Sequence, residues 1–233
     1  MSVVDLTREG AVFVLTLNAG ENRFNRGFVD ALNGALDEVE RSSGPAALVT
    51  TGGTEKFYSN GLDLSWMGSE EGRNEGAKFV QDVMGLFARL LAYPVPVVAA
   101  LNGHVFAAGA MLALAHDFRV MRADRGFFCL PEVDINIPFA PGMTALIQAK
   151  LSAKVVVETV LTGVRLGGAQ ALERGIVDAA VAGPDVLPHA IERAAGLAAK
   201  DRGTYGAIKR GLYARILPIL TGADSVAGSR LPS

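Results

Sequence analysis

The stretch from Val95 to Gly142 constrains the fold of this chain more than any other part of it. It begins with an unbroken apolar run over residues 95–101, which predicts a buried strand. The chain then turns at Asn102-Gly103-His104 and continues into very small residues, Ala107 to Ala110. Small side chains allow another group to approach the main chain, and the first turn of a helix offers unpaired N–H donors and favours negative charge. The stretch therefore predicts a polar site built from backbone groups.

A lone carboxylate, Glu132, lies in the same stretch between apolar neighbours. Apolar surroundings raise the pKa of a carboxylate, which suits general acid–base chemistry. On spacing alone, a surface carboxylate at the end of a strand explains Glu132 equally well. Asp134 follows two residues later, so the two side chains would point the same way if this segment is extended. The spacing thus allows a carboxylate pair without requiring one.

Length and composition indicate one domain with a sizeable core. The chain has 233 residues, half of them hydrophobic, and a formal net charge of -2, which gives no electrostatic footprint for nucleic acid. A single cysteine, Cys129, excludes an intramolecular disulfide and fits a reducing compartment. The N-terminus lacks a signal-peptide pattern, and no apolar run approaches the ~20 residues that span a bilayer. We therefore expect a cytoplasmic protein with neither a nucleic acid nor a membrane as its partner.

The order of predicted elements favours an α/β fold. Asn25 is placed to cap a helix, and strands alternate with helices through the first two-thirds of the chain, as in β-α units around a core sheet. No repeat or Ser/Gly-rich linker interrupts the sequence, so we expect one domain over residues 1–233. The expected strands cover residues 11–17, 46–51, 95–101, 118–121, 127–130 and 176–181, and the expected helices after Asn25 cover residues 75–92, 107–116, 143–151, 153–161, 169–174, 186–200 and 205–217.

Several common site motifs are missing from the sequence. It contains no GxGxxG after its first strand, no GxxxxGK[ST], no HExxH and no G-x-S-x-G, and its three histidines lack metal-ligand spacing. His116 falls at an apparent helix end, where a positive charge interacts favourably with the helix dipole. A structural role is therefore a simpler explanation for His116 than metal binding. Cys129 in an apolar strand reads as buried and inert. We expect neither a metal nor a separate cofactor.

Two loops instead provide candidate hydrogen-bond donors. Residues 57–64 and residues 102–109 each follow a predicted strand and each offer backbone N–H groups. Side by side, they could direct two donors at one carbonyl oxygen, which is the arrangement of an oxyanion hole. Either loop alone is more simply explained as an ordinary strand–turn–helix connection.

Taken together, these residues resemble the crotonase (enoyl-CoA hydratase/isomerase) superfamily over roughly Ala11 to Lys209. The loop Phe-x-Ser-Asn-Gly-Leu-Asp-Leu from Phe57 is similar to the first CoA-binding and oxyanion loop of the family, and residues 96–104 are similar to the strand and turn before the second. The later segment from Leu161 to Asp178 also matches in order. The resemblance implies a crotonase-like spiral of β-β-α units (residues 1–183) with a helical C-terminal region (residues 184–233) that builds homotrimers, often paired into hexamers.

The resemblance also implies roles for individual residues. The N–H groups of Leu62 and Ala108 would bind the thioester oxygen of an acyl-CoA, which is a substrate rather than a cofactor. Residues of the first loop would line the path of the pantetheine and adenine, namely Ser59, Asn60, Gly61 and Asp63. The candidates for contacts to CoA phosphates are Arg23, Lys56, Lys209 and Arg210, although solvated surface charge is the simpler explanation for any one of them. The candidates for the acyl pocket are Trp66, Phe106, Phe128, Phe139 and Met143, and core packing explains each of these equally well.

The pattern of carboxylates distinguishes reactions within the family. The hydratases have two glutamates, and here the first position holds Met111 while the second holds Glu132. One carboxylate suffices to move a proton from the α-carbon to the γ-carbon of a 3-enoyl-CoA, with Glu132 alternating between base and acid. The sequence thus most resembles the Δ3-Δ2-enoyl-CoA isomerases.

Three alternatives remain open at this level. Glu132 could serve an enoyl-CoA hydratase whose second carboxylate comes from elsewhere, such as Asp134. It could activate water in an acyl-CoA thioester hydrolase. The chain could also be a non-catalytic acyl-CoA-binding protein, with which Met111 is compatible.

Overall fold

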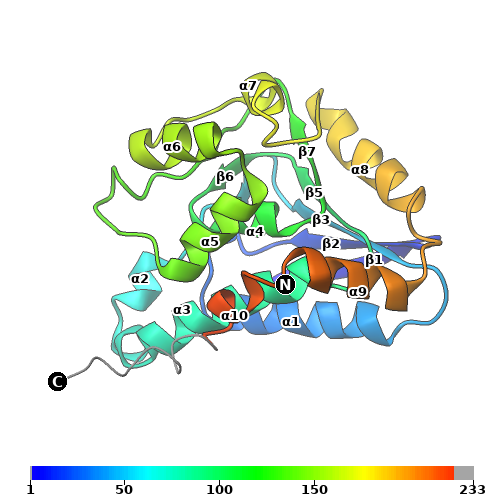
Figure 1. The fold of residues 1–233 in the computed structure, drawn as a ribbon, viewed down its shortest axis with the longest axis horizontal. Coiled ribbons are helices and arrows are strands. Elements are labelled where there is room, and N and C mark those ends of the chain that lie inside the picture. Colours follow the sequence, from blue (N-terminus) through cyan, green and yellow to red (C-terminus); the bar gives the residue numbers. More distant parts are fainter. Residues whose placement is uncertain (1, 223–233) are drawn as a thin grey trace.

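The computed structural model describes residues 2–222, which form two sheets surrounded by helices (Figure 1). The larger sheet has the strand order β1-β2-β3-β5-β7-β9, in which β1 is antiparallel to β2 and the other neighbours are parallel. The smaller sheet has the order β4-β6-β8 and is parallel. The strands are β1 (Val4–Glu9), β2 (Val12–Leu17), β3 (Ala47–Gly52), β4 (Phe57–Ser59), β5 (Val97–Leu101), β6 (His104–Phe106), β7 (Phe118–Arg122), β8 (Phe128–Cys129) and β9 (Ala179–Val181).

Ten α-helices are distributed along the described residues, with several of them covering the larger sheet. In Figure 1, α8 lies beside that sheet at the upper right, while α1 and α3 lie below it. The helices are α1 (Arg26–Arg41), α2 (Leu64–Met67), α3 (Glu70–Leu91), α4 (Ala108–Ala115), α5 (Pro141–Lys150), α6 (Ala153–Thr162), α7 (Gly168–Glu173), α8 (Val186–Ala195), α9 (Arg202–Leu212) and α10 (Leu217–Leu220). The expected α/β architecture and its helical C-terminal region are both present.

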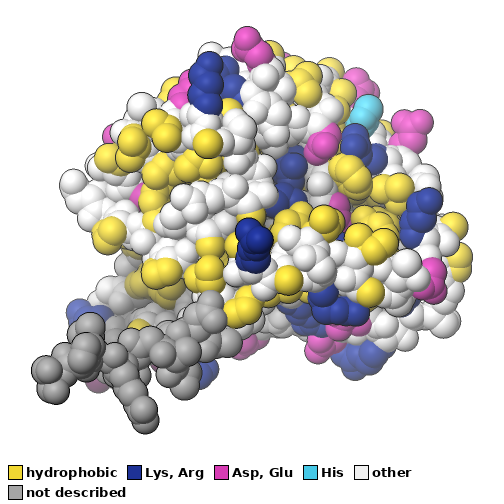
Figure 2. All heavy atoms as spheres, viewed as in Figure 1, with side chains coloured by type: hydrophobic (Ala, Val, Ile, Leu, Met, Phe, Trp, Pro, Cys, Tyr) yellow, Lys and Arg dark blue, Asp and Glu magenta, His cyan; other side chains and the backbone are white. Residues whose placement is uncertain are grey.

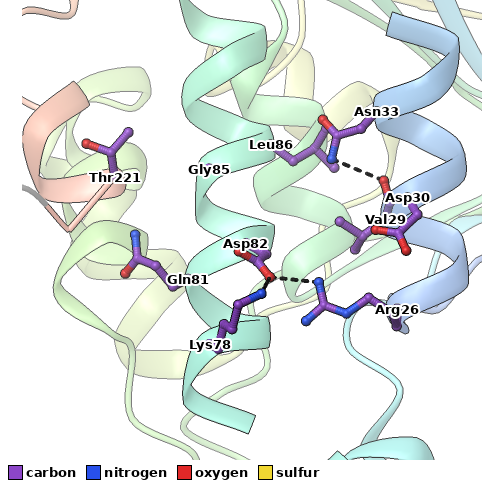
Figure 3. Close-up of a pocket in the computed structure, with 10 residues that line it drawn as sticks. All are labelled: Arg26, Val29, Asp30, Asn33, Lys78, Gln81, Asp82, Gly85, Leu86 and Thr221. Atoms are coloured by element: carbon purple, nitrogen blue, oxygen red, sulfur yellow. Dashed lines mark hydrogen bonds and ion pairs between the residues drawn. The ribbon is translucent and has the colours of Figure 1, made fainter. Parts of the chain in front are cut away.

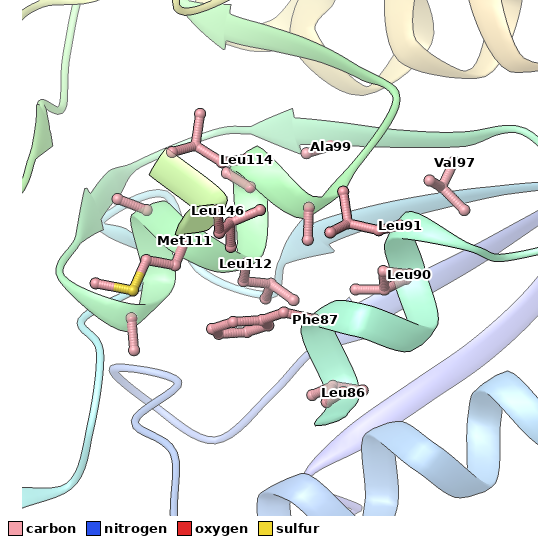
Figure 4. Packing of buried hydrophobic residues seen from close by; sticks show 14 of the residues in the cluster. Leu86, Phe87, Leu90, Leu91, Val97, Ala99, Met111, Leu112, Leu114 and Leu146 are labelled. Atoms are coloured by element: carbon pink, nitrogen blue, oxygen red, sulfur yellow. The ribbon is translucent and has the colours of Figure 1, made fainter. Parts of the chain in front are cut away.

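Strands β2, β3 and β5 of the larger sheet are buried on both faces, which explains their continuous apolar runs. Along β2, Val12 and Val14 pack with α8, whereas Phe13, Leu15 and Leu17 belong to the core on the opposite face. This alternation follows from the two-residue repeat of a strand. On that opposite face, side chains of α3, α4 and α5 interdigitate (Figure 4).

Several local predictions are confirmed by hydrogen bonds and packing. Asn25 caps α1, because its Oδ1 accepts from the N–H of Phe28 at 3.0 Å. The apolar run at residues 95–101 contains β5, whose residues are all buried. No helix within residues 2–222 is long and apolar enough to cross a membrane.

Other local predictions were incomplete or wrong. Strand β1 was not expected, because its charged residues hide an edge strand that is exposed over most of its length. Helix α3 begins at Glu70 rather than at residue 75, since the Ser69 side chain caps it by accepting from the N–H of Gly72. The two loops expected after β3 and β5 contain β4 and β6, which pair with each other across 47 residues of chain. Such pairing has no local signal.

The segment around Glu132 is also not extended. The N–H groups of Asp134 and Ile135 both donate to the carbonyl of Pro131, at 2.9 and 3.2 Å, so the chain turns here. Asp134 is exposed, and its carboxylate lies directly against Gly163. The idea that Glu132 and Asp134 point the same way along a strand is therefore wrong.

Candidate active site

A cavity of about 200 Å³ lies where three parts of the chain meet: the loop after β4, the start of α4, and the segment between β8 and α5. Its surface is largely apolar, with a few polar groups, as in many small-molecule sites. It is lined by Arg23, Asn60, Leu62, Leu64, Ala107, Ala108, Met111, Pro131, Glu132, Ile135, Ile137, Pro138 and Met143.

The loop after β4 is held so that the backbone of Leu62 faces this region. The Phe24 N–H donates to the Gly61 carbonyl at 2.8 Å, and the Asp63 N–H donates to the Phe24 carbonyl at 2.9 Å. These two bonds flank Leu62, whose own N–H has no partner among residues 2–222. Gly61 has a φ of +82° and lies so close to Ala107 that a Cβ there would approach the Ala107 Cβ to 2.9 Å. Glycine is therefore needed to bring the loop against the start of α4.

Helix α4 presents its N-terminus to the same cavity. Ala108 is its first residue, and no hydrogen bond within residues 2–222 takes up the Ala108 N–H. The N-cap residue, Ala107, has a φ of 52° and a ψ of -123°, a conformation that costs a non-glycine residue of order 1–3 kcal/mol. Its N–H is bound to the Cys129 carbonyl at 3.0 Å. The unpaired donor and the helix dipole make this end of α4 attractive to negative charge.

Glu132 is the acidic group of the cavity. Its residue is only 5% exposed, and its Oε2 atom is buried without a hydrogen-bond partner. Burial raises the pKa of this carboxyl from 4.5 to about 7, because the ionised form loses hydration, while a backbone hydrogen bond opposes the rise. At neutral pH the group can therefore exist in either protonation state.

The residues predicted in the first loop have different positions. Asn60 lines the cavity and donates to the Glu21 carboxylate at 3.0 Å. Ser59 is buried and donates to the Asn22 carbonyl at 2.7 Å, and Asp63 caps α2 by accepting from the Trp66 N–H at 3.0 Å. Ser59, Gly61 and Asp63 thus shape the loop, and their contact with a substrate stays a prediction.

The four predicted basic residues lie in different surroundings. Arg23 lines the cavity and is paired with Glu21, while Lys56 and Arg210 are exposed. Lys209 is 4% exposed and forms an ion pair with Asp117 at 2.8 Å. Its proposed contact with a CoA phosphate is therefore wrong, because the charge is buried and paired.

The structure adds residues that the sequence did not single out. Ile135, Ile137 and Pro138 line the cavity, yet their apolar side chains carry no pattern that distinguishes them from core residues. Of the five apolar candidates for the acyl pocket, Met143 is the one that lines this cavity, and Phe128 is fully buried in the core. Ile135, Ile137 and Pro138 lie outside the helices and strands, so no sequence periodicity shows that they line the cavity.

A larger hollow of about 530 Å³ lies between α1 and α3, but its chemistry is different (Figure 3). Its charged side chains neutralise one another: Arg26 binds Asp82 at 2.7 Å, and Lys78 binds the same carboxylate at 3.1 Å. Within residues 2–222, no three His, Cys, Asp or Glu side chains are grouped so as to hold a metal ion. The cavity beside Glu132 is therefore the better candidate site.

Comparison with known proteins agrees with this geometry. A family model described as enoyl-CoA hydratase/isomerase matches residues 7–221. The peroxisomal enoyl-CoA delta isomerase 2 of Arabidopsis thaliana is 35% identical over 225 residues, which cover 92% of this chain and 94% of the plant protein. Carnitinyl-CoA dehydratase of Escherichia coli is 33% identical over 196 residues, which cover 81% of this chain and 72% of that protein.

Similarity extends to solved structures. The apo structure of an enoyl-CoA isomerase from Mycobacterium tuberculosis matches with a TM-score of 0.88 at 27% identity, covering 98% of this chain and 99% of the other. The crotonase-type fold expected from the sequence is thereby confirmed. The chain belongs to the enoyl-CoA hydratase/isomerase family.

Proposed function

We propose that this protein is a Δ3-Δ2-enoyl-CoA isomerase that uses Glu132 as its single proton carrier. One observation carries the proposal: among the described residues that line the cavity, Glu132 is the sole carboxylate, and its Oε2 atom is buried without a hydrogen-bond partner. Met111, fully buried in α4, lines the same cavity and cannot exchange a proton. The identity to plant enoyl-CoA delta isomerases supports the same reaction.

The proposed reaction moves one proton and one pair of π electrons. Ionised Glu132 removes a proton from the α-carbon of a 3-enoyl-CoA, and the electrons of that C–H bond shift toward the thioester oxygen to form a dienolate. The N–H groups of Leu62 and Ala108 would stabilise the negative oxygen, because donors that are already oriented need no reorganisation. Protonated Glu132 then returns the proton to the γ-carbon, which leaves the double bond between the α- and β-carbons.

The raised pKa of Glu132 suits both halves of this reaction. A general base works best when its pKa lies near the operating pH, because it must take up the proton and release it again. The pKa of about 7 meets that condition. The absence of a hydrogen-bond partner for Oε2 leaves one oxygen available to the substrate.

The substrate would enter past Arg23 and Asn60 and place its acyl chain among the apolar residues of the cavity. The homotrimer or hexamer and the cytoplasmic location remain predictions. Exposed apolar side chains on α6 and α9 are candidates for subunit contacts: Val157, Leu161, Ile208 and Leu212. Figure 2 shows hydrophobic side chains at the surface over the region of α6.

A hydration or dehydration reaction is the second candidate, and similarity to carnitinyl-CoA dehydratase favours it. Hydration requires water to be held and activated, for which the family's hydratases use two carboxylates, and Met111 occupies the position of one of them. Asp134, the other acid close in sequence, does not line the cavity. We therefore rank isomerisation first.

The test is to incubate the purified protein with 3-hexenoyl-CoA and follow formation of the conjugated thioester by absorbance, with crotonyl-CoA as a parallel assay for hydration. Isomerisation without hydration supports the proposal. Loss of the crotonyl chromophore, or release of free CoA, without isomerisation would instead assign a hydratase or a hydrolase. Binding of CoA without any turnover would indicate a non-catalytic acyl-CoA-binding protein.

A further inference from the structure

Three buried polar side chains form a hydrogen-bonded chain behind the cavity. The Thr50 Oγ1 atom lies 2.8 Å from the Tyr58 hydroxyl and 2.9 Å from Nε2 of His116, and Nδ1 of His116 lies 2.8 Å from the Leu112 carbonyl. Tyr58 and His116 are fully buried and Thr50 is 3% exposed. Buried polar groups are costly unless paired, so a complete chain inside an apolar core requires an explanation.

The direction of each hydrogen bond follows from chemistry. The Leu112 carbonyl can only accept, so Nδ1 of His116 carries the proton that is donated. Burial lowers the pKa of His116 to about 3, so the ring is neutral and Nε2 accepts from the Thr50 hydroxyl. The Thr50 oxygen then accepts from the Tyr58 hydroxyl. Every member is satisfied in one arrangement, and the buried ring agrees with the structural role that was expected for His116.

The chain joins the two elements that carry the candidate donors. Tyr58 belongs to β4 and precedes Leu62 by four residues, while His116 is the C-cap of α4, the helix that begins at Ala108. Thr50 bridges them from β3, a central strand of the larger sheet. The same two elements also touch at the opposite end of α4, where a Cβ on Gly109 would approach the Ser59 carbonyl oxygen to 2.5 Å. Helix α4 is thus held against β4 at both ends.

Apolar packing alone would not determine this placement. All eight residues of α4 are apolar and buried, and half of them are alanines. Burial of apolar surface stabilises the helix but has no direction, so it does not by itself specify how the helix is rotated about its axis. Hydrogen bonds of fixed length and angle do specify this rotation.

We propose that Tyr58, Thr50 and His116 are positioning residues, which set the spacing between the N–H groups of Leu62 and Ala108. The proposal rests on the oxyanion role of these two donors in the proposed function. It assigns no contact between the three side chains and the substrate. They act by holding β4 and α4 in one relative position.

The experiment compares Tyr58→Phe, Thr50→Val and Thr50→Ser with the wild-type protein. Two quantities are measured: kcat and KM for 3-hexenoyl-CoA, and the absorption shift of bound cinnamoyl-CoA, whose band moves to longer wavelength when its thioester carbonyl accepts hydrogen bonds. We expect kcat to fall about tenfold in Tyr58→Phe and further in Thr50→Val, because displacement of a donor by a fraction of an ångström costs most where charge develops on the oxygen that it binds. KM should change less than about twofold, and the absorption shift should shrink. Thr50→Ser keeps the hydroxyl and should restore both.

Tyr93→Phe is the matched control. The Tyr93 hydroxyl is also buried and donates to the carbonyl of Leu36 at 2.6 Å, but it holds α1 and not the site. Its removal should lower thermal stability as much as Tyr58→Phe while leaving kcat and the absorption shift unchanged. If Tyr58→Phe and Thr50→Val behave like this control, the three residues are structural only and the proposal is overturned.

The two proposals fail in different ways. A wild-type protein that does not isomerise 3-hexenoyl-CoA but shifts the cinnamoyl-CoA band disproves the proposed reaction, and the band still tests the positioning residues. A wild-type protein that binds cinnamoyl-CoA without any shift has no donor pair to position, which overturns the inference directly. If Thr50→Val loses cooperative unfolding, the comparison rests on Tyr58→Phe against Tyr93→Phe, since each of these changes removes only a hydroxyl group.

Discussion

The two ends of α4 have opposite polar environments. At its N-terminus, the N–H of Ala108 and the Oε2 atom of Glu132 lack partners among residues 2–222. Just past its C-terminus, the Asp117 carboxylate accepts from the Val97 N–H at 2.9 Å and the Tyr205 hydroxyl at 3.1 Å, and pairs with Lys209. One helix therefore separates a region of unpaired groups from a region of paired ones.

The two ends of α4 therefore differ in role: the groups at its N-terminus can react with a ligand, and those at its C-terminus stabilise the fold. The Asp117 carboxylate is taken up by three partners from β5 and α9, so it serves to anchor α9. The Glu132 carboxyl has one oxygen without a partner and a pKa raised to about 7, so Glu132 can exchange a proton. The following predictions test this division, beginning with the largest expected effect.

Replacement of Glu132 by glutamine should abolish the proton transfer while keeping the shape of the side chain. We expect kcat for isomerisation to fall about 10³-fold, within the range for loss of a general acid–base group. The matched control is Asp134→Asn, since Asp134 is exposed and turned toward Gly163, and its kcat should stay within about twofold of wild type. Steady-state kinetics of both variants would reject the single-carboxylate mechanism if they lost equal activity.

Replacement of Lys209 by methionine should affect stability and leave the chemistry largely intact. Removing one partner of a buried ion pair leaves the Asp117 charge poorly compensated, so the free energy of unfolding should fall by about 3 kcal/mol. Lys78→Met is the control, because the Lys78 side chain is 76% exposed in its pair with Asp82 and should contribute less than about 1 kcal/mol. Denaturant unfolding measures both. A large fall in kcat of Lys209→Met without a fall in its free energy of unfolding would contradict a purely structural role for this ion pair.

The raised pKa of Glu132 predicts a specific dependence on pH. The folded protein keeps this proton up to about pH 7, whereas the unfolded chain releases it near 4.5, so stability from this group is complete below pH 4.5 and is lost as the pH rises toward 7. Glu132→Gln removes that loss, and the variant should gain about 3 kcal/mol relative to wild type between pH 4 and pH 8, because each unit of pKa difference corresponds to about 1.4 kcal/mol. Unfolding curves at the two pH values measure the gain.

Ionisation of Glu132 lowers the stability of the protein, but it should raise the catalytic activity. Because ionised Glu132 removes the first proton, kcat/KM should rise as the pH increases through about 7. A profile that is flat from pH 5 to pH 9 would show that another group accepts the proton.

The smallest effect concerns the strained start of α4. Ala107→Gly should raise the free energy of unfolding by about 1 kcal/mol, since glycine adopts a φ of 52° without the steric cost that alanine incurs. Ala110→Gly in the same helix has ordinary helical geometry and should lower it by a similar amount. Equal signs for the two variants, measured by thermal unfolding, would contradict the assignment of strain to Ala107.

Much of the fold was predictable from local pattern. Asn25 as a helix cap and the apolar strand at residues 95–101 each follow from a residue and its immediate neighbours, whereas spacing alone left Glu132 equally well explained as a surface carboxylate. The strand β1 was missed because its charged residues mask the strand pattern, and the turn at Pro131–Ile135 was missed because Pro-Glu-Val-Asp also suits a strand end. The position of Lys209 was misjudged because a lysine on a helix is usually solvated, and only its contact with Asp117 shows otherwise.

The sequence alone determined which groups are available: two loops with small residues, one carboxylate in apolar surroundings, and a methionine where a second carboxylate could have stood. Tertiary structure decided which of these groups meet. Thr50 and His116 are separated by 66 residues, yet they share a hydrogen bond, and β4 pairs with β6 although Phe57 and His104 lie 47 residues apart in the chain. The physical reason is that propensity and apolar burial act locally or without direction, whereas the pairing of buried polar groups depends on distances that only the folded chain defines.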